Sequence, residues 1–134
     1  MEEPTFELDR LDAFPFPFAL DESLADIPLS QLTTFPQLTT LIIKPTVCSY
    51  PLKIIEQLGK QIILTGAFES GIGTAQIATF AKRRNLTSNP LGLDTYRFLE
   101  EDVLHSRLDF SQGSLTLPNQ FCLNPQYLTE VSHG

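Results

Sequence analysis

The chain has little of what marks several common classes of protein. Only 9 of its 134 residues are Lys or Arg, against 16 acidic residues, so a nucleic-acid-binding groove is not expected. No apolar run approaches the roughly 20 residues that cross a membrane, and the acidic start at 1–4 lacks the apolar segment of a signal peptide. Cys48 and Cys122 show neither a CxxC motif nor metal-ligand spacing, so we expect free thiols. We therefore predict a cytoplasmic protein.

Apolar residues make up 42% of the chain, enough for one core, and several of them gather in short runs. The runs at 16–20, 41–43 and 62–65 are continuous rather than alternating, as in strands buried on both faces. A weaker strand is expected at 92–98. Each gap between these runs is long enough for the helix that a parallel crossover needs. The pattern predicts an α/β protein with about four βα units.

Helical patterns occupy the gaps between the expected strands. We expect a helix at 51–58 with Gly59 after its end, and one at 74–84 whose basic end, 82–84, favours the helix dipole. The residues of the second helix expected to face the sheet are Ile77, Ala78, Phe80 and Ala81. Shorter helical turns are expected within 4–13, 23–40 and 100–104, then an extended piece at 113–117 and a polar tail.

Charged residues follow the first two strands directly. Asp21 and Glu22 come after the run at 16–20, and Lys44 comes after the run at 41–43. Side chains at the carboxyl ends of parallel strands meet at one edge, where α/β barrels carry out their chemistry. We expect Lys44 to be desolvated there, with a lowered pKa. An acid and a lysine on neighbouring strand ends suit metal-assisted proton chemistry on a carbon acid.

Several short motifs occur in an order and spacing that resemble a known family. They are Ala19-Leu20-Asp21-Glu22-Ser23, Ile43-Lys44-Pro45-Thr46, Phe68-Glu69-Ser70-Gly71-Ile72-Gly73 and Gly92-Leu93-Asp94-Thr95. Together with Glu2-Glu3-Pro4, similar to the family's Glu-x-Pro on the fourth barrel strand, they resemble the C-terminal half of the o-succinylbenzoate synthases of the enolase superfamily. The resemblance implies half of a TIM-type (β/α) barrel, with residues 1–112 forming the partial barrel and 113–134 an extended segment and tail.

The resemblance also implies a chemistry. Enolase-type enzymes bind Mg²⁺ through carboxylates on successive strand ends, and the ion holds the carboxylate of a small-molecule substrate while a neighbouring C–H loses its proton. The synthase expels water from a cyclohexadiene to give o-succinylbenzoate, a precursor of menaquinone and phylloquinone. The family pattern implies Asp21 and Glu2 as metal ligands, Glu22 as a residue that orients a ligand or pairs with Lys44, and Lys44 as the catalytic electrostatic partner. At the N-terminus, Glu2 is expected to fray, because almost no strand precedes it.

The loop at 65–73 is expected to contact the substrate. Small residues before a helix expose backbone N–H groups that suit an anion, here the succinyl carboxylate. The substrate-binding candidates are Thr65, Gly66, Glu69, Ser70 and Gly92. A dinucleotide loop is disfavoured, because the third glycine and an acidic ribose partner are missing.

Two parts of the family's site have no counterpart in this sequence: the base lysine of a Lys-x-Lys strand, and the metal-binding Asp of the strand after it. We therefore expect a lyase that is inactive alone. Three explanations are open: a fragment of a longer gene product, one half of a split enzyme with an N-terminal half as partner, or a decayed remnant. Two alternatives stay open. One is an N-acylamino acid racemase or dipeptide epimerase with Lys44 as a true base. The other is a non-catalytic half-barrel that pairs its open edges with another chain.

Overall fold

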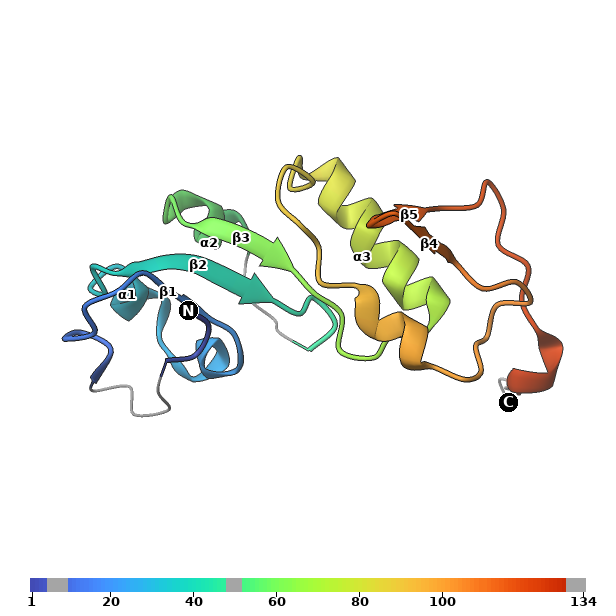
Figure 1. Cartoon of the computed structure of the whole chain (residues 1–134), viewed down its shortest axis with the longest axis horizontal. Helices are drawn as coiled ribbons and strands as arrows, with labels where there is room; N and C mark the ends of the chain where they lie inside the picture. The colour runs from blue at the N-terminus through green and yellow to red at the C-terminus, as the bar shows by residue number, and fades with distance from the viewer. Residues whose placement is uncertain (5–9, 48–51, 130–134) are drawn as a thin grey trace, which may run out of the picture.

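A parallel sheet forms the first part of the molecule (Figure 1). The computed structural model describes residues 1–4, 10–47 and 52–129. Strands β1 (Phe18–Leu20), β2 (Leu38–Ile43) and β3 (Gln61–Leu64) pair in that order, all in parallel. The three continuous apolar runs are therefore confirmed as strands, although β1 is shorter and β2 longer than predicted.

Single parallel bridges extend the sheet at both margins. Glu2 pairs with Ala19 beside β1, and Thr65 pairs with Gly92 beyond β3. Backbone hydrogen bonds fix both bridges: Ala19 N–H donates to the Met1 carbonyl at 2.8 Å, and Gly66 N–H donates to the Gly92 carbonyl at 2.9 Å. The backbone of the first residues is therefore tied to the sheet, so the expected fraying at Glu2 is wrong.

The predicted fourth strand is largely absent. After the bridge at Gly92, the backbone turns into a 3₁₀ helix, Asp94–Phe98. Asp94 favours such a turn at its start, and the turn directs Tyr96 into the interior, where it is 1% exposed. Phe98, at the end of the predicted strand, is 65% exposed. A helical turn that buries Tyr96 thus occupies the position of the predicted strand.

The helices agree more closely with expectation. They are α1 (Leu29–Leu32), α2 (Leu52–Gln57) and α3 (Gly71–Arg83). Gly59, expected after the end of α2, has φ +66°, a conformation that favours glycine. The α3 helix begins earlier than predicted, directly after its cap Ser70. None of the described helices has the length and apolarity to cross a membrane.

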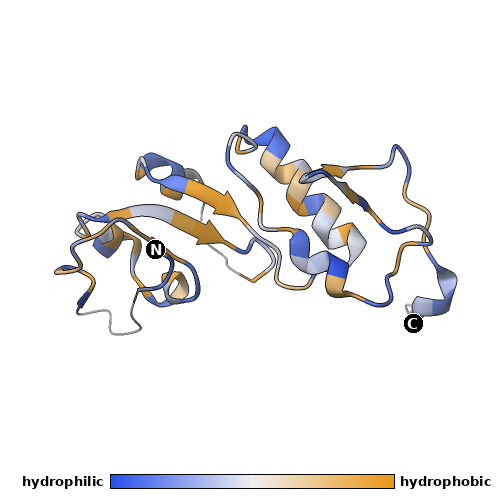
Figure 2. Cartoon of the chain, in the orientation of Figure 1, coloured by the Kyte–Doolittle hydropathy of each residue, from blue (hydrophilic) through white to orange (hydrophobic). Residues whose placement is uncertain are grey.

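The core lies between one face of the sheet and the helices. Leu41 and Ile43 of β2 pack with Leu64 of β3, Ile55 of α2 and Ile77 of α3. Figure 2 shows this apolar character along β2 and β3. On α3, Ala81 is buried as expected, but Phe80 is 36% exposed, because the buried stripe runs through Thr74, Ile77 and Ala81 instead.

The C-terminal part packs on α3 around a smaller core. Its hairpin consists of β4 (Asp109–Ser111) and β5 (Ser114–Thr116), joined through Gln112 and Gly113, which both have positive φ. The extended piece expected at 113–117 is thus confirmed, and the predicted domain boundary falls inside this turn. The helical turn expected at 100–104 is wrong, because Leu104 forms an antiparallel bridge with Leu123. The expected turn within 4–13 lies partly outside the described residues.

Candidate functional site

A hollow of about 540 Å³ opens where the parallel strands end. Alternation along the strands builds it: Ile42 and Lys44 of one strand, and Ile63 and Thr65 of the next, point away from the helix-covered face. Seven residues expected to form the site line this hollow: Glu2, Asp21, Glu22, Lys44, Thr65, Gly66 and Gly92. The other lining residues are Ile42, Ile63, Ala67, Phe68, Pro90, Leu91 and Thr95.

Lys44 joins two acids across neighbouring strands. Its Nζ donates to Asp21 Oδ1, and to Glu22 Oε1 at 3.2 Å. The side chains of Lys44 and Asp21 are 23% and 10% exposed, whereas that of Glu22 is 66% exposed. Asp21 is therefore the sheltered partner of the lysine, and Glu22 pairs with the lysine from the rim of the hollow. The expectation that Glu22 pairs with Lys44 is confirmed.

The pKa of Lys44 is raised rather than lowered. Burial alone would lower this pKa, but the hydrogen bonds to Asp21 and Glu22, with their charges, more than offset it. The expectation of a lowered pKa is therefore wrong for this chain, because the acids that follow β1 reach the lysine. For Glu22, a backbone hydrogen bond and the bond from Lys44 lower the pKa.

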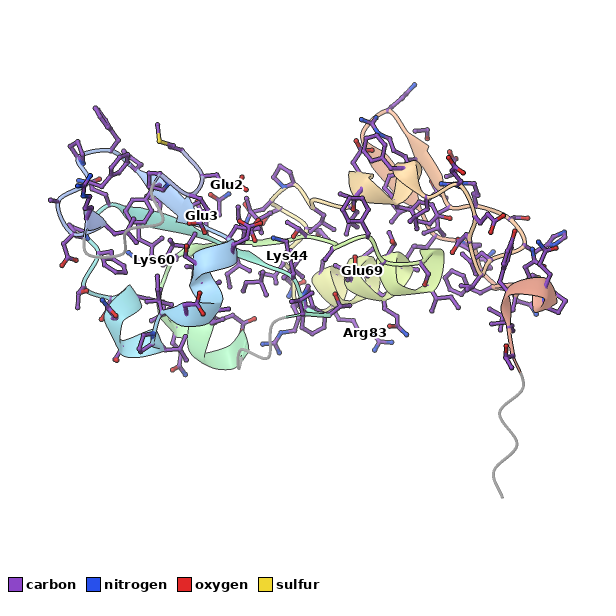
Figure 3. The ribbon with its side chains drawn as sticks, turned by 90° about the horizontal axis from the view of Figure 1, so that it is seen from below. Glu2, Glu3, Lys44, Lys60, Glu69 and Arg83 are labelled. Carbon is purple, nitrogen blue, oxygen red and sulfur yellow. The ribbon has the colours of Figure 1, made fainter. Side chains whose placement is uncertain are left out.

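Glu3 is a contributor that the sequence did not reveal. Its Oε1 accepts the backbone N–H groups of Asp21, at 2.5 Å, and of Ser23, at 3.1 Å, while Oε2 accepts the Ser23 hydroxyl at 3.0 Å. One carboxylate thus holds the loop that carries Asp21 and Glu22. No local pattern could have shown this, because the partners are brought together by the parallel bridge at the start of the chain. In Figure 3, Glu2 and Glu3 lie between Lys60, toward the outer end of the sheet, and Lys44, nearer the middle of the molecule.

Close backbone approach shapes the far wall of the hollow. A Cβ on Gly92 would come within 2.7 Å of Thr65 Cγ2, so a larger residue there would push the two strand ends apart. Among the described residues, Thr65 Oγ1 is a buried polar atom without a hydrogen-bond partner. Most buried polar groups have a hydrogen-bond partner, so this hydroxyl is an unusual feature of the wall.

Glu69 and Ser70 do not line this hollow. Glu69 accepts from the Thr46 hydroxyl and from the Ala67 N–H, so it links the loops after β2 and β3. Ser70 Oγ caps α3 by accepting from Gly73 N–H at 3.4 Å, and Gly71 N–H donates to Asp102 Oδ1 at 2.8 Å. The first amides of α3 therefore have partners within the protein, contrary to the expectation that they face a substrate anion.

The charges of the hollow suit a cation. Three carboxylates, Glu2, Asp21 and Glu22, face a single ammonium, that of Lys44. Carboxylate oxygens are the ligands that Mg²⁺ prefers. In the described part of the chain, however, no three such side chains converge to hold an ion. The donor type fits a magnesium site, but the chain brings together only part of a ligand set.

This chain resembles known proteins both in sequence and in structure. Protein PHYLLO, chloroplastic, of Arabidopsis thaliana is 33% identical to this chain over an alignment of 137 residues, gaps included. The match covers 81% of this chain and 8% of PHYLLO. A mandelate racemase/muconate lactonizing protein from Herpetosiphon aurantiacus superposes with a TM-score of 0.66 at 19% identity, over 90% of this chain and 38% of that protein. This chain shares its fold with part of that protein. No family model matches.

These likenesses bear on the expectations in different ways. The structural likeness supports an α/β fold with a parallel sheet, and this fold corresponds to part of the larger neighbour. The chain spans only a small share of PHYLLO, so nothing about the whole activity of that protein passes directly to this one. The name of PHYLLO refers to the chloroplast, and our expectation of a cytoplasmic protein stays a prediction.

Proposed function

We propose that this chain is the C-terminal half of an enolase-superfamily barrel that acts as an o-succinylbenzoate synthase. The reaction is the loss of water from a cyclohexadiene carboxylate, on the route to menaquinone or phylloquinone. One observation carries the proposal: Asp21, Glu22 and Lys44, from successive strand ends, share one hollow with Thr65 and Gly92. The similarity to PHYLLO and to the mandelate racemase/muconate lactonizing protein supports it.

The charge of the hollow gives the proposal a physical basis. With three carboxylates against one ammonium, a substrate carboxylate would be repelled unless a divalent cation lay between them. Asp21 and Glu2 would supply two oxygen ligands for Mg²⁺. When bound, the ion would neutralise the substrate carboxylate and the charge that develops at the neighbouring carbon.

The side chains of this chain position the substrate around that ion. The Lys44 ammonium lies beside Asp21 and would stabilise negative charge on the substrate. Glu22 orients Lys44 from the rim, and Glu3 holds the backbone of Asp21 in place. Thr65, Gly66 and Gly92 line the same hollow and would form the wall beside the far end of the substrate, and the backbone hydrogen bonds from Gly92 N–H to Leu64 and from Gly66 N–H to Gly92 hold that wall in place.

The proposal needs a second polypeptide part. The lysine that removes the proton, and the third carboxylate of the metal site, would come from the other half of the barrel. The chain covers 38% of the mandelate racemase/muconate lactonizing protein, which leaves the remainder of that fold to supply them. A racemase or epimerase reaction is the second candidate, because the name of that protein includes a racemase.

Dehydratase activity with Mg²⁺ tests the proposal. The purified chain is assayed alone and mixed with the separately expressed N-terminal half of a related synthase. We expect activity only in the mixture, lost in Lys44→Ala and Asp21→Asn. The matched controls are Lys60→Ala, at the amino end of β3, and Asp109→Asn, in the exposed hairpin, which keep activity.

Other outcomes decide between the alternatives. Activity of the chain alone would contradict the need for a second half. Racemisation of an N-acylamino acid without dehydration would favour the racemase. If a folded chain associates with the N-terminal half but neither reaction occurs, the non-catalytic half-barrel is the better description.

A further inference from the structure

Phe68 holds an unfavourable backbone conformation. Its φ is +64°, in the left-handed region, where a bulky aromatic residue is an outlier. Nothing in its packing offsets this cost, because 63% of the residue is exposed. Strain that packing does not offset collects at functional sites, where the surrounding structure enforces it.

The residues that flank Phe68 enforce this conformation. Before it, the Ala67 N–H donates to the Glu69 carboxylate, which also accepts from Thr46 in the loop after β2. After it, Ser70 caps α3 and so fixes the start of the helix. The turn that presents Phe68 is therefore held from both sides by the loop and the helix that it connects.

Phe68 stands between two hollows. It lines the hollow at the strand ends, and also a second one of about 290 Å³ beside Ser70, Asp102 and Tyr127. The lining of the first hollow includes charged residues from the first two strand ends and also apolar residues, among them Ile63, Leu91 and Phe68. The lining is therefore two-sided, and it suits a ligand with a charged end and an apolar body.

We propose that Phe68 is the specificity-determining wall that contacts the apolar ring of the substrate while its carboxylate lies toward Asp21 and Lys44. This inference rests on the proposed function and deepens it by assigning the contact to the apolar part of the substrate. An aromatic ring exposed to solvent in the free chain gains a partner when such a ligand binds. The left-handed backbone holds the ring at the hollow before the ligand arrives.

Ligand titration followed by NMR tests this wall. The chain, with labelled phenylalanine rings, is titrated with Mg²⁺ and o-succinylbenzoate, alone and with the N-terminal half of a related synthase. We expect the Phe68 ring resonances and the amides of Asp21 and Lys44 to shift together. In Phe68→Ala, the dissociation constant should rise about tenfold. Phe98→Ala, an equally exposed ring outside both hollows, should leave it unchanged.

The outcomes separate this inference from the function on which it rests. Shifts at Asp21 and Lys44 without a shift of the Phe68 ring would overturn the wall and leave the proposed function standing. No shift at any of these positions, with or without the second half, would overturn both.

A stability measurement adds an independent arm. Phe68→Gly should leave the urea midpoint unchanged or higher, because glycine accepts the left-handed backbone and little packing is lost. A clearly lower midpoint would show that Phe68 is a structural residue, and would overturn its assignment to the ligand.

Discussion

Two sheltered aspartates in this molecule have contrasting surroundings. Asp102, 9% exposed, is bound on both oxygens by groups without charge: Gly71 N–H at 2.8 Å and the Tyr96 hydroxyl at 2.6 Å. Asp21 has a side chain 10% exposed, but it faces an ammonium at the edge of an open hollow with surplus negative charge. Both carboxylates are sheltered, so the type of partner separates a structural carboxylate from a candidate ligand.

The consequence for stability follows from these partners. Asp102 ties the start of α3 to the C-terminal segment, and Arg107 lies over the Tyr96 ring, with its guanidinium carbon 5.0 Å from the ring centroid. A fully satisfied buried network rigidifies the structure around it. Asp21 leaves capacity for a further cation, which is what a binding site needs.

The largest expected loss of stability is in Asp102→Ala. Removing this carboxylate leaves Gly71 N–H and the Tyr96 hydroxyl without their acceptor, at a cost of about 3 kcal/mol in the free energy of unfolding. Urea denaturation measures it. The exposed neighbour, in Glu101→Ala, should cost less than about 0.5 kcal/mol. Equal losses in the two variants would contradict the structural assignment of Asp102.

Glu3→Ala should come next. This substitution leaves three donors, in Asp21 and Ser23, without their acceptor. We therefore expect the free energy of unfolding to fall by about 2 kcal/mol. Its neighbour Glu2 has an exposed side chain, so Glu2→Ala should stay within about 0.5 kcal/mol. The same urea titration compares the pair, and a larger loss in Glu2→Ala would reverse the roles given to them here.

Asp21→Asn should lower the free energy of unfolding less than Asp102→Ala or Glu3→Ala does, but it should strongly lower activity. The amide keeps the shape of the carboxylate and Lys44 keeps its pair with Glu22, so we expect a loss of about 1 kcal/mol in unfolding free energy. Activity of the mixed halves should fall at least about 100-fold, because a metal ligand is lost. A variant that is less stable than Asp102→Ala yet keeps its activity would erase the contrast between the two aspartates.

The smallest effect concerns pH. The pKa of Lys44 is raised, so its contribution to stability is present below its unfolded pKa, near 10.5, and is lost as pH rises through the folded value. The pKa of Glu22 is lowered, so its contribution is present above about 4.5 and is lost as pH falls through the folded value. Between these limits the pair contributes a constant amount, below about 1 kcal/mol. Lys44→Met should reduce the alkaline loss in a pH series of urea midpoints, and an unchanged series would count against the ion pair.

The same contrast explains what the sequence could and could not predict. Continuous apolar runs located β1, β2 and β3, and the charged residues directly after two of them located Asp21 and Lys44, because strand ends share an edge. The pattern at 100–104 predicts a helical turn around Asp102. The structural role of Asp102 depends instead on Gly71, which is distant along the chain, and on Tyr96, which the sequence assigns to a strand.

Long-range partners also account for the other errors. The raised pKa of Lys44 requires knowing that Asp21 and Glu22 reach it across the strands. The role of Glu3 requires the bridge that lays the first residues beside β1. In both cases, a contact between segments overrode the local pattern. Tyr96 differs, because the turn that begins at Asp94 directs it inward, and its hydroxyl donates to Asp102 nearby in the chain.

The hairpin between β4 and β5 offers a place to add sequence. A side chain at Gly113 would meet no atom within 4 Å, and both turn residues are exposed. Exposed loop tips of this kind are the positions where proteins accept inserted peptides. A short tetracysteine or epitope sequence placed between Gln112 and Gly113 would therefore carry a fluorescent reporter outside the hollow at the strand ends, and so allow assembly of the two halves to be followed in living cells.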